Sequence, residues 1–400
     1  MEEGFVGRQP IYKDGVDVFA YELFSRNNEL NQAAFANGDT VTAEALLHEC
    51  LTGLESVAGK QPAFVNATRD FVLNDYSWFL PRREVILQID GDTKRDQALL
   101  KATSSLKQAG YSIALKDFDC SDETRPFMEV ADIVKVDVRS RDRDVLEKEF
   151  DTIRSLNAKV LAHGVETLQD YQTAKSIGSD YYEGYFFCKP NPQQNKPVPH
   201  NRISTLQLLA TLQKPDATLD QMEKALGQDM AMSHRILRYV NSPMNPSPRK
   251  VDSIRHAISL VGTNLIQQWA SVIWLDSIEE KPRELMVMAA IRANMCRQLG
   301  VAMGCENLDQ FFTAGLLSLL DALMDRPMSK ILEDLPLIDP VKDALLNRTG
   351  PMGDAIKCTE AYERCDWENT TCRDLDANTI RDSYLTGVLW SRAALNELKN

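Results

Sequence analysis

The chain has 400 residues, of which 44% are hydrophobic and 26% are charged. This composition is typical of a globular protein with a buried core, and the length fits two domains better than one. The formal net charge of −13 argues against nonspecific binding to nucleic acid and against attachment to an anionic membrane. No apolar run approaches the roughly 18 residues of a membrane span, and the first residues lack a signal-peptide core. We therefore expect a cytoplasmic protein.

The first half of the chain alternates short apolar or β-branched runs with amphipathic runs. Several strand-like runs start about 20 to 27 residues apart, which is the pitch of a βα unit. The predicted strands are residues 16–23, 63–66, 84–89, 112–115, 133–138, 159–162 and 181–186, and the predicted helices are 41–58, 93–109, 143–156 and 168–176. About seven or eight such units predict a closed (β/α)8-type barrel. The alternative is an open doubly wound sheet. It is less favoured because the sequence has no glycine-rich phosphate-binding loop after the first predicted strand.

A polar segment with four prolines, KPNPQQNKPVPHNR at 189–202, follows the last predicted strand. Such a segment cannot join a core and indicates a linker. Only helical patterns follow it, and the first of them begins with a capping signal formed by Thr218 and Gln221. We predict an α/β domain at 1–195, a linker at 196–202 and an all-α domain at 203–400.

Polar side chains stand at the carboxyl ends of the predicted strands, where a barrel of this kind brings them to one mouth. They are Glu22, Asn66, Gln88, Lys116 with Asp117, Lys135, His163 with Glu166, and Glu183. Carboxylate and amide oxygens that converge in this way are the ligands that Mg²⁺ prefers. Two such ions can bind the attacking water and the leaving oxygen during hydrolysis of a phosphodiester.

The same residues carry a resemblance. Residues 5 to about 192 resemble the EAL domain, the cyclic-di-GMP phosphodiesterase barrel of bacterial signalling. The motifs that carry it are ELFSR at 22–26, NAT at 66–68, KDFD at 116–119, KVD at 135–137, AHGVE at 162–166, and EGY at 183–185 followed by KP at 189–190. The remnant site that the resemblance implies consists of Glu22, Asn66, Asp117, Lys135 and Glu166.

Four positions depart from the family pattern: Gln88 and Lys116 stand in place of acidic residues, His163 replaces a glutamate, and Glu183 replaces a glutamine. Lys116 puts a positive charge where a metal needs a negative one. At about 4 Å and an effective dielectric near 20, each pair of unit charges is worth about 4 kcal/mol. We therefore expect no bound metal, no cofactor and no hydrolysis.

Two roles are open to Lys116. In the first, its ammonium replaces the metal as counterion to Glu22, Asp117 and Glu166. In the second, a cyclic dinucleotide is bound without being cleaved, its phosphates held by Arg26, Lys116, Lys135 and His163.

The helical half, from residue 203 to about 368, resembles the HDOD domain, a relative of the HD phosphohydrolases. The carrying stretches are 208–242, 251–269 and 311–324. HD enzymes need an adjacent His-Asp pair as metal ligands, and Ser318 and Leu319 stand where that pair would fall. No hydrolase site is therefore expected here. Trp269, Trp274 and Trp367 could anchor a partner, although aromatic residues at helical spacing more often lie in a core.

Together the two halves resemble the EAL–HDOD (YuxH-type) signalling proteins. We predict a noncatalytic signalling or scaffold protein whose helical domain binds an unidentified signalling protein, with a homodimer as a further possibility. The alternatives are a cyclic-di-GMP sensor without hydrolysis, and a weak phosphodiesterase that uses Mg²⁺ or Mn²⁺.

Overall fold

The computed structural model describes residues 7–13, 17–24, 54, 57–74, 80–139, 141–190, 218–227, 230–241, 251–276, 278 and 281–399. The chain divides into two compact units, Met1–Phe186 with Glu363–Cys365 and Phe187–Tyr362 with Asp366–Asn400. The predicted linker, most of the helix predicted at 41–58, and Arg26 lie outside the described residues. None of the described helices is long and apolar enough to cross a membrane.

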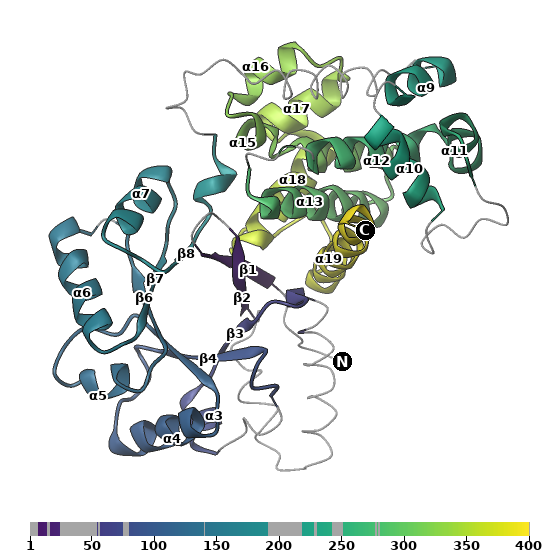
Figure 1. Ribbon diagram of the computed structural model, residues 1–400. Helices are drawn as coiled ribbons and strands as arrows, with labels where there is room; N and C mark the ends of the chain where they lie inside the picture. Colours follow the sequence, from purple (N-terminus) through teal and green to yellow (C-terminus); the bar gives the residue numbers. More distant parts are fainter. Residues whose placement is uncertain are drawn as a thin grey trace. The chain divides into compact units, whose positions relative to one another are not determined.

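The first unit is a closed barrel in which each strand pairs with the next and β8 pairs with β1 (Figure 1). Its strands are β1 Gly7–Tyr12, β2 Val18–Phe24, β3 Ala63–Asn66, β4 Val85–Asp90, β5 Ser112–Lys116, β6 Ile133–Asp137, β7 Lys159–His163 and β8 Tyr181–Glu183. From β2 to β8 all neighbouring strands are parallel. The prediction of an eight-stranded α/β barrel is confirmed.

One strand was missing from the sequence prediction. β1 runs antiparallel to both β2 and β8, so the barrel is not a uniform (β/α)8 barrel. Its sequence, GRQPIY, contains Arg8, Gln9 and Pro10 and has none of the apolar alternation that marks the other strands.

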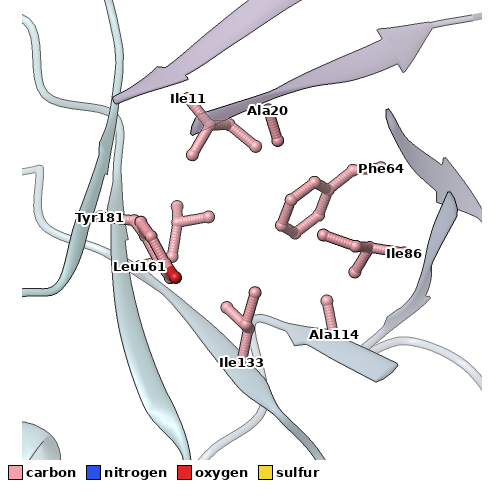
Figure 2. Packing of buried hydrophobic residues seen from close by; sticks show 8 residues of the cluster. All are labelled: Ile11, Ala20, Phe64, Ile86, Ala114, Ile133, Leu161 and Tyr181. Atoms are coloured by element: carbon pink, nitrogen blue, oxygen red, sulfur yellow. The ribbon is translucent and has the colours of Figure 1, made fainter. Parts of the chain in front are cut away.

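The barrel is filled by an apolar layer to which each strand contributes one side chain (Figure 2). The eight residues of this layer are Ile11, Ala20, Phe64, Ile86, Ala114, Ile133, Leu161 and Tyr181. All are buried, and Phe19 stacks on Tyr181 with ring centroids 4.1 Å apart. The interior is a packed core rather than a pore, and it forms the floor beneath the strand ends.

Helices connect the parallel strands and lie outside the barrel in Figure 1. They are α3 Arg69–Leu73, α4 Gln97–Gln108, α5 Arg125–Met128, α6 Arg143–Ser155 and α7 Leu168–Ser176, with a short 3₁₀ turn η3 at Phe186–Cys188. Side-chain caps fix where the longer helices begin: Asp96 caps α4, Asp142 caps α6, and Thr167 with Asp170 forms a capping box on α7.

The second unit is all-α, as predicted. Its described helices are α9 Leu219–Gly227, α10 Met230–Val240, α11 Ile254–Val261, α12 Thr263–Asp276, α13 Arg283–Ala302, α14 Leu308–Leu317, α15 Leu320–Met324, α16 Met328–Glu333, α17 Asp339–Asn347, α18 Gly350–Glu363 and α19 Ala377–Lys399. The capping box predicted before α9 is present, because Thr218 and Gln221 exchange backbone-to-side-chain hydrogen bonds.

Helix α13 is the centre of this unit and is buried along most of its length. α14 and α19 pack on it, and Gly315 lets α14 approach closely, since an added Cβ would lie 2.4 Å from the carbonyl oxygen of Arg292. Trp269 and Trp274, considered above as partner anchors, are buried core residues. The aromatic stack of Tyr239 on Trp269 is part of this core.

Candidate functional site

The candidate site is the layer directly above the apolar floor. Side chains two positions apart along a strand face the same side, so the residue two positions after each floor residue of β2 to β8 also points into the barrel. These residues are Glu22, Asn66, Gln88, Lys116, Lys135, His163 and Glu183. The period of two thus brings the sequence-predicted strand-end residues together at one mouth, here called the mouth layer.

Three charged side chains of the mouth layer form a buried cluster. Lys135 Nζ lies 2.5 Å from Glu22 Oε2 and 2.6 Å from Glu183 Oε2. Lys135 is only 1% exposed, and both glutamates are buried with it. The sequence-based hypothesis named Lys116 as the counterion of Glu22; the charge of Lys116 does lower the pKa of Glu22, but the ammonium in contact with Glu22 is that of Lys135. Lys135 takes the role because its side chain is the ammonium that contacts both carboxyl groups.

The three buried groups of the cluster shift the pKa values of one another. Burial opposes ionisation of Glu22, but the charge of Lys135 and the hydrogen bonds from Glu183 and Lys135 together lower the pKa of Glu22 to about 2. Burial and the negative charge of Glu22 raise the pKa of Glu183 well above its ordinary value. Burial would also lower the pKa of Lys135, but the two carboxyl groups raise it instead. Lys135 is thus occupied as a buried counterion and is not available to a ligand.

The raised pKa of Glu183 predicts an unusual pH dependence of stability. Its folded-state pKa lies above the unfolded value of 4.5, so the folded chain keeps a proton that the unfolded chain releases. Stability contributed by this group is therefore complete below about pH 4.5 and is lost as the pH rises through the folded pKa. We expect Glu183→Gln to become more stable relative to the natural protein as the pH rises from 5 to 8.

Urea unfolding at pH 5, 6.5 and 8 measures this effect. The exposed Glu147→Gln on α6 is the matched control and should show no such trend. An equal difference between Glu183→Gln and the natural protein at all three pH values would contradict a protonated Glu183.

Two amide side chains extend the buried cluster. Gln88 Nε2 donates to Glu22 Oε1 at 2.8 Å and to Asn66 Oδ1 at 2.6 Å. A glutamate at position 88 would have no N–H to donate and would add a third carboxyl group beside Glu22 and Glu183. Gln88 is therefore the residue type that suits a mouth whose positive charge is Lys135.

The other half of the mouth layer is open to solvent. The Lys116 side chain is 28% exposed, and its Nζ lies 3.7 Å from Asp90 Oδ1. Burial raises the pKa of Asp90 although the charge of Lys116 opposes this. Asp90 was missed from the sequence, yet it is the register partner of Lys116 across β4 and β5. Extending the predicted strand at 84–89 by one residue would have found it.

His163 and Asp117 form a hydrogen-bonded pair in this open half. His163 Nε2 lies 2.7 Å from Asp117 Oδ1, with the side chains 12% and 49% exposed. The hydrogen bond from His163 lowers the pKa of Asp117, and the charge of Lys116 adds to the effect. Asp117 has a left-handed backbone with φ of 55°, which aspartate tolerates better than most residues. Gly91 leaves room for this turn, since an added Cβ would meet the carbonyl oxygen of Asp117 at 2.3 Å.

Three further charged residues lie near the pair. Arg139 Nη2 lies 2.6 Å from Asp137 Oδ2, with the arginine side chain 59% exposed. Burial opposes ionisation of Asp137, but its hydrogen bonds from Arg139 lower its pKa. Arg139 was not among the predicted site residues. Glu166, which was, lies exposed on the loop after β7.

The donors gathered at the mouth do not fit a divalent cation. Glu22 already has an ammonium 2.5 Å from one oxygen, Gln88 directs its N–H groups toward Glu22 and Asn66, and Lys116 brings a further positive charge. In the part of the chain that the structure describes, no three His, Cys, Asp or Glu side chains meet in an arrangement that could hold a metal. The expectation that no metal binds stays a prediction.

Comparison with known proteins identifies the two units. The sequence model of the EAL domain matches residues 54–190, and that of the HDOD domain matches residues 198–325. The chain carries an EAL domain followed by an HDOD domain. The expectation of this domain pair is confirmed.

Two relatives align with this chain along nearly the whole length of both proteins. "Cyclic di-GMP phosphodiesterase CdgJ" of Vibrio cholerae is 28% identical over 97% of this chain and 92% of its own length. "Uncharacterized protein YuxH" of Bacillus subtilis is 27% identical over 96% of this chain and 97% of its own. Among solved structures, "PaMucR Phosphodiesterase, c-di-GMP complex" covers 51% of this chain and 100% of its own, at 17% identity and a TM-score of 0.39.

The similarity to CdgJ overturns one expectation. The sequence predicted that the chain is not an enzyme, because Lys116 and Gln88 weaken a metal site. A relative aligned along nearly the whole chain is named a phosphodiesterase. The prediction of a noncatalytic protein is therefore wrong. The sequence had suggested His163 as a proton acceptor, but its hydrogen bond with Asp117 was not foreseen.

In the second unit, an arginine network contacts Ser318, one of the two residues that stand where the sequence resemblance places the His-Asp pair of HD enzymes. Arg292 Nη1 donates to Ser318 Oγ at 3.2 Å and to Glu360 Oε1 at 3.1 Å. Arg348 Nη2 donates to the same Glu360 oxygen at 2.9 Å. Burial raises the pKa of the nearby Asp321. Two guanidinium groups around one carboxylate stabilise the helix packing and disfavour a cation here.

Proposed function

We propose that this chain is a cyclic di-GMP phosphodiesterase of a signalling pathway, acting at the mouth of its EAL barrel. The similarity to CdgJ over 97% of the chain supports the substrate. The observation that carries the proposal is the His163–Asp117 pair beside Lys116, in the solvent-open half of the mouth layer. A base oriented by a carboxylate and a neighbouring cation are the parts that hydrolysis of a phosphodiester needs.

Each of these residues has a role in the proposed reaction. Asp117 accepts a hydrogen bond from His163 Nε2, which leaves Nδ1 as the proton acceptor. His163 takes a proton from water, and the resulting hydroxide attacks phosphorus. One P–O ester bond breaks, and the leaving oxygen takes the proton back from His163. The ammonium of Lys116 binds a phosphate oxygen and stabilises the charge that develops on it. The product is a linear dinucleotide with a terminal phosphate.

The buried half of the mouth layer has a supporting role. The cluster of Lys135, Glu22 and Glu183 joins β6, β2 and β8 across the barrel, and so holds the strand ends in place. Turnover should be slow, because a general base alone contributes about 10²- to 10⁴-fold.

Chromatography of reaction products tests the proposal. The full-length protein is incubated with cyclic di-GMP and Mg²⁺, Mn²⁺ or a chelator. We expect linear dinucleotide in all three mixtures, and about 100-fold less with Lys116→Ala. Lys101→Ala, an exposed lysine of α4, is the control. Absence of product in all three mixtures would overturn the proposed function, and loss of product with the chelator alone would overturn the metal-independent mechanism.

A further inference from the structure

The second unit contains a cavity of about 280 Å³ formed by α11, α12, α13, α14 and α19. It lies among helices within the second unit. Ligand pockets of proteins usually start at about 300 Å³, so this one suits a ligand the size of a nucleobase or nucleoside rather than a large cofactor. It contains no residue of the arginine network around Ser318.

The wall of the cavity contains a buried amide oxygen without a hydrogen-bond partner among the described residues. Asn294 of α13 is 2% exposed, and its Oδ1 accepts no hydrogen bond from them. A buried carbonyl oxygen left without a donor is unfavourable, and a ligand that brings an N–H donor into the cavity would satisfy it.

A second unpaired group lies one helical turn away. Arg297 Nε is buried and has no hydrogen-bond partner, and Arg297 forms no ion pair within the described part of the chain. Across the cavity, Asp309 is already engaged: Asn264 Nδ2 donates to it at 2.5 Å and Gln268 Nε2 donates to it at 2.7 Å. One positive and one negative side chain line the cavity, so its charge is balanced and a neutral ligand is favoured over a phosphate.

Two aromatic rings complete the wall. Phe312 and Trp390 meet edge to face, with centroids 5.4 Å apart and planes at 83°, and both line the cavity. A planar ligand ring can stack on such a surface, and aromatic side chains are common stacking partners of nucleobases.

We propose that this cavity binds a purine base or nucleoside. An asparagine amide pairs with the adjacent N–H donor and ring-nitrogen acceptor of adenine, and an arginine donates to the acceptors of a purine edge. Asn294 supplies the first contact, Arg297 the second, and Phe312 with Trp390 the stacking surface. This binding site is separate from the barrel mouth and does not depend on the proposed hydrolysis.

Isothermal titration of the full-length protein with adenosine, guanosine and adenine tests the proposal. Cytidine, phenylalanine and inorganic phosphate serve as comparison ligands. We expect a purine to bind with a Kd below about 1 mM. Asn294→Leu should weaken binding about 10- to 100-fold without loss of thermal stability, since it removes an unsatisfied buried amide. Arg297→Met should also weaken binding, whereas the exposed Arg373→Met and the barrel variant Lys116→Ala should not.

Three results would overturn the proposal. The first is absence of purine binding at 1 mM, and the second is stronger binding of phenylalanine or phosphate than of any purine. The third is purine binding that Lys116→Ala abolishes and Asn294→Leu leaves unchanged, which would place the ligand in the barrel.

Discussion

Replacing Lys135 by methionine is expected to lower the free energy of unfolding of the barrel by about 3 to 5 kcal/mol. The ammonium of Lys135 is the positive charge that contacts both Glu22 and Glu183, and all three residues are buried. Without it, Glu22 must either stay charged in an apolar surrounding or take up a proton. Because a domain is stable by only about 5 to 15 kcal/mol, this is a large share of the total.

Hydrogen exchange of peptides from β2, β6 and β8, combined with urea unfolding, measures this loss within the barrel. Lys107→Met is the matched control, because Lys107 pairs with Asp132 with both side chains more than a third exposed, and such pairs contribute about 1 kcal/mol or less. Adding Glu22→Gln and Glu183→Gln to Lys135→Met should restore most of the stability. A Lys135→Met protein as stable as the Lys107→Met protein would show that the cluster is not the counterion arrangement described above.

Replacing His163 by glutamine is expected to reduce turnover of cyclic di-GMP by about 10²- to 10⁴-fold, which is what general base catalysis contributes. Glutamine keeps hydrogen-bonding capacity toward Asp117 but cannot take a proton from water. Asp117→Asn should cause a smaller loss, since it removes the carboxylate that orients and stabilises the charged imidazole.

The assay compares initial rates of linear dinucleotide formation at saturating substrate. His256→Gln, at a half-exposed histidine of α11, is the control for the same change of residue type. Substrate binding by His163→Gln should stay close to that of the natural protein, so that the loss is in kcat. Unchanged turnover in His163→Gln would remove His163 from the mechanism.

The sequence was sufficient to predict the barrel and the identity of most mouth residues. Strand periodicity predicted the barrel, and the strand ends predicted the mouth residues. Both predictions hold because every second side chain of a strand faces the barrel interior, first in the floor and then in the mouth layer. It was not sufficient for β1, because its arginine, glutamine and proline break the apolar pattern of a strand. Antiparallel pairing with β2 and β8 holds this strand in the barrel. The predicted cytoplasmic location, protein partner and homodimer stay predictions.

The pairing of charges at the mouth could not be predicted from spacing. Lys116 and Lys135 are opposite each other in the β5–β6 register, and the sequence placed both at the mouth without telling them apart. Only the closed barrel shows that Lys135 meets Glu22, 113 positions away, while Lys116 faces Asp90. The His163–Asp117 pair likewise depends on the left-handed turn at Asp117, which no sequence pattern marked.

The most direct test of the proposed chemistry compares the natural protein with Lys116→Asp combined with Gln88→Glu, measuring linear dinucleotide formed from cyclic di-GMP with Mg²⁺ and with a chelator. We expect product from the natural protein in both conditions and less product from the double variant with the chelator, because the phosphate-binding ammonium is gone. If the natural protein forms no product in either condition while the double variant forms product only with Mg²⁺, the proposed metal-independent mechanism is contradicted.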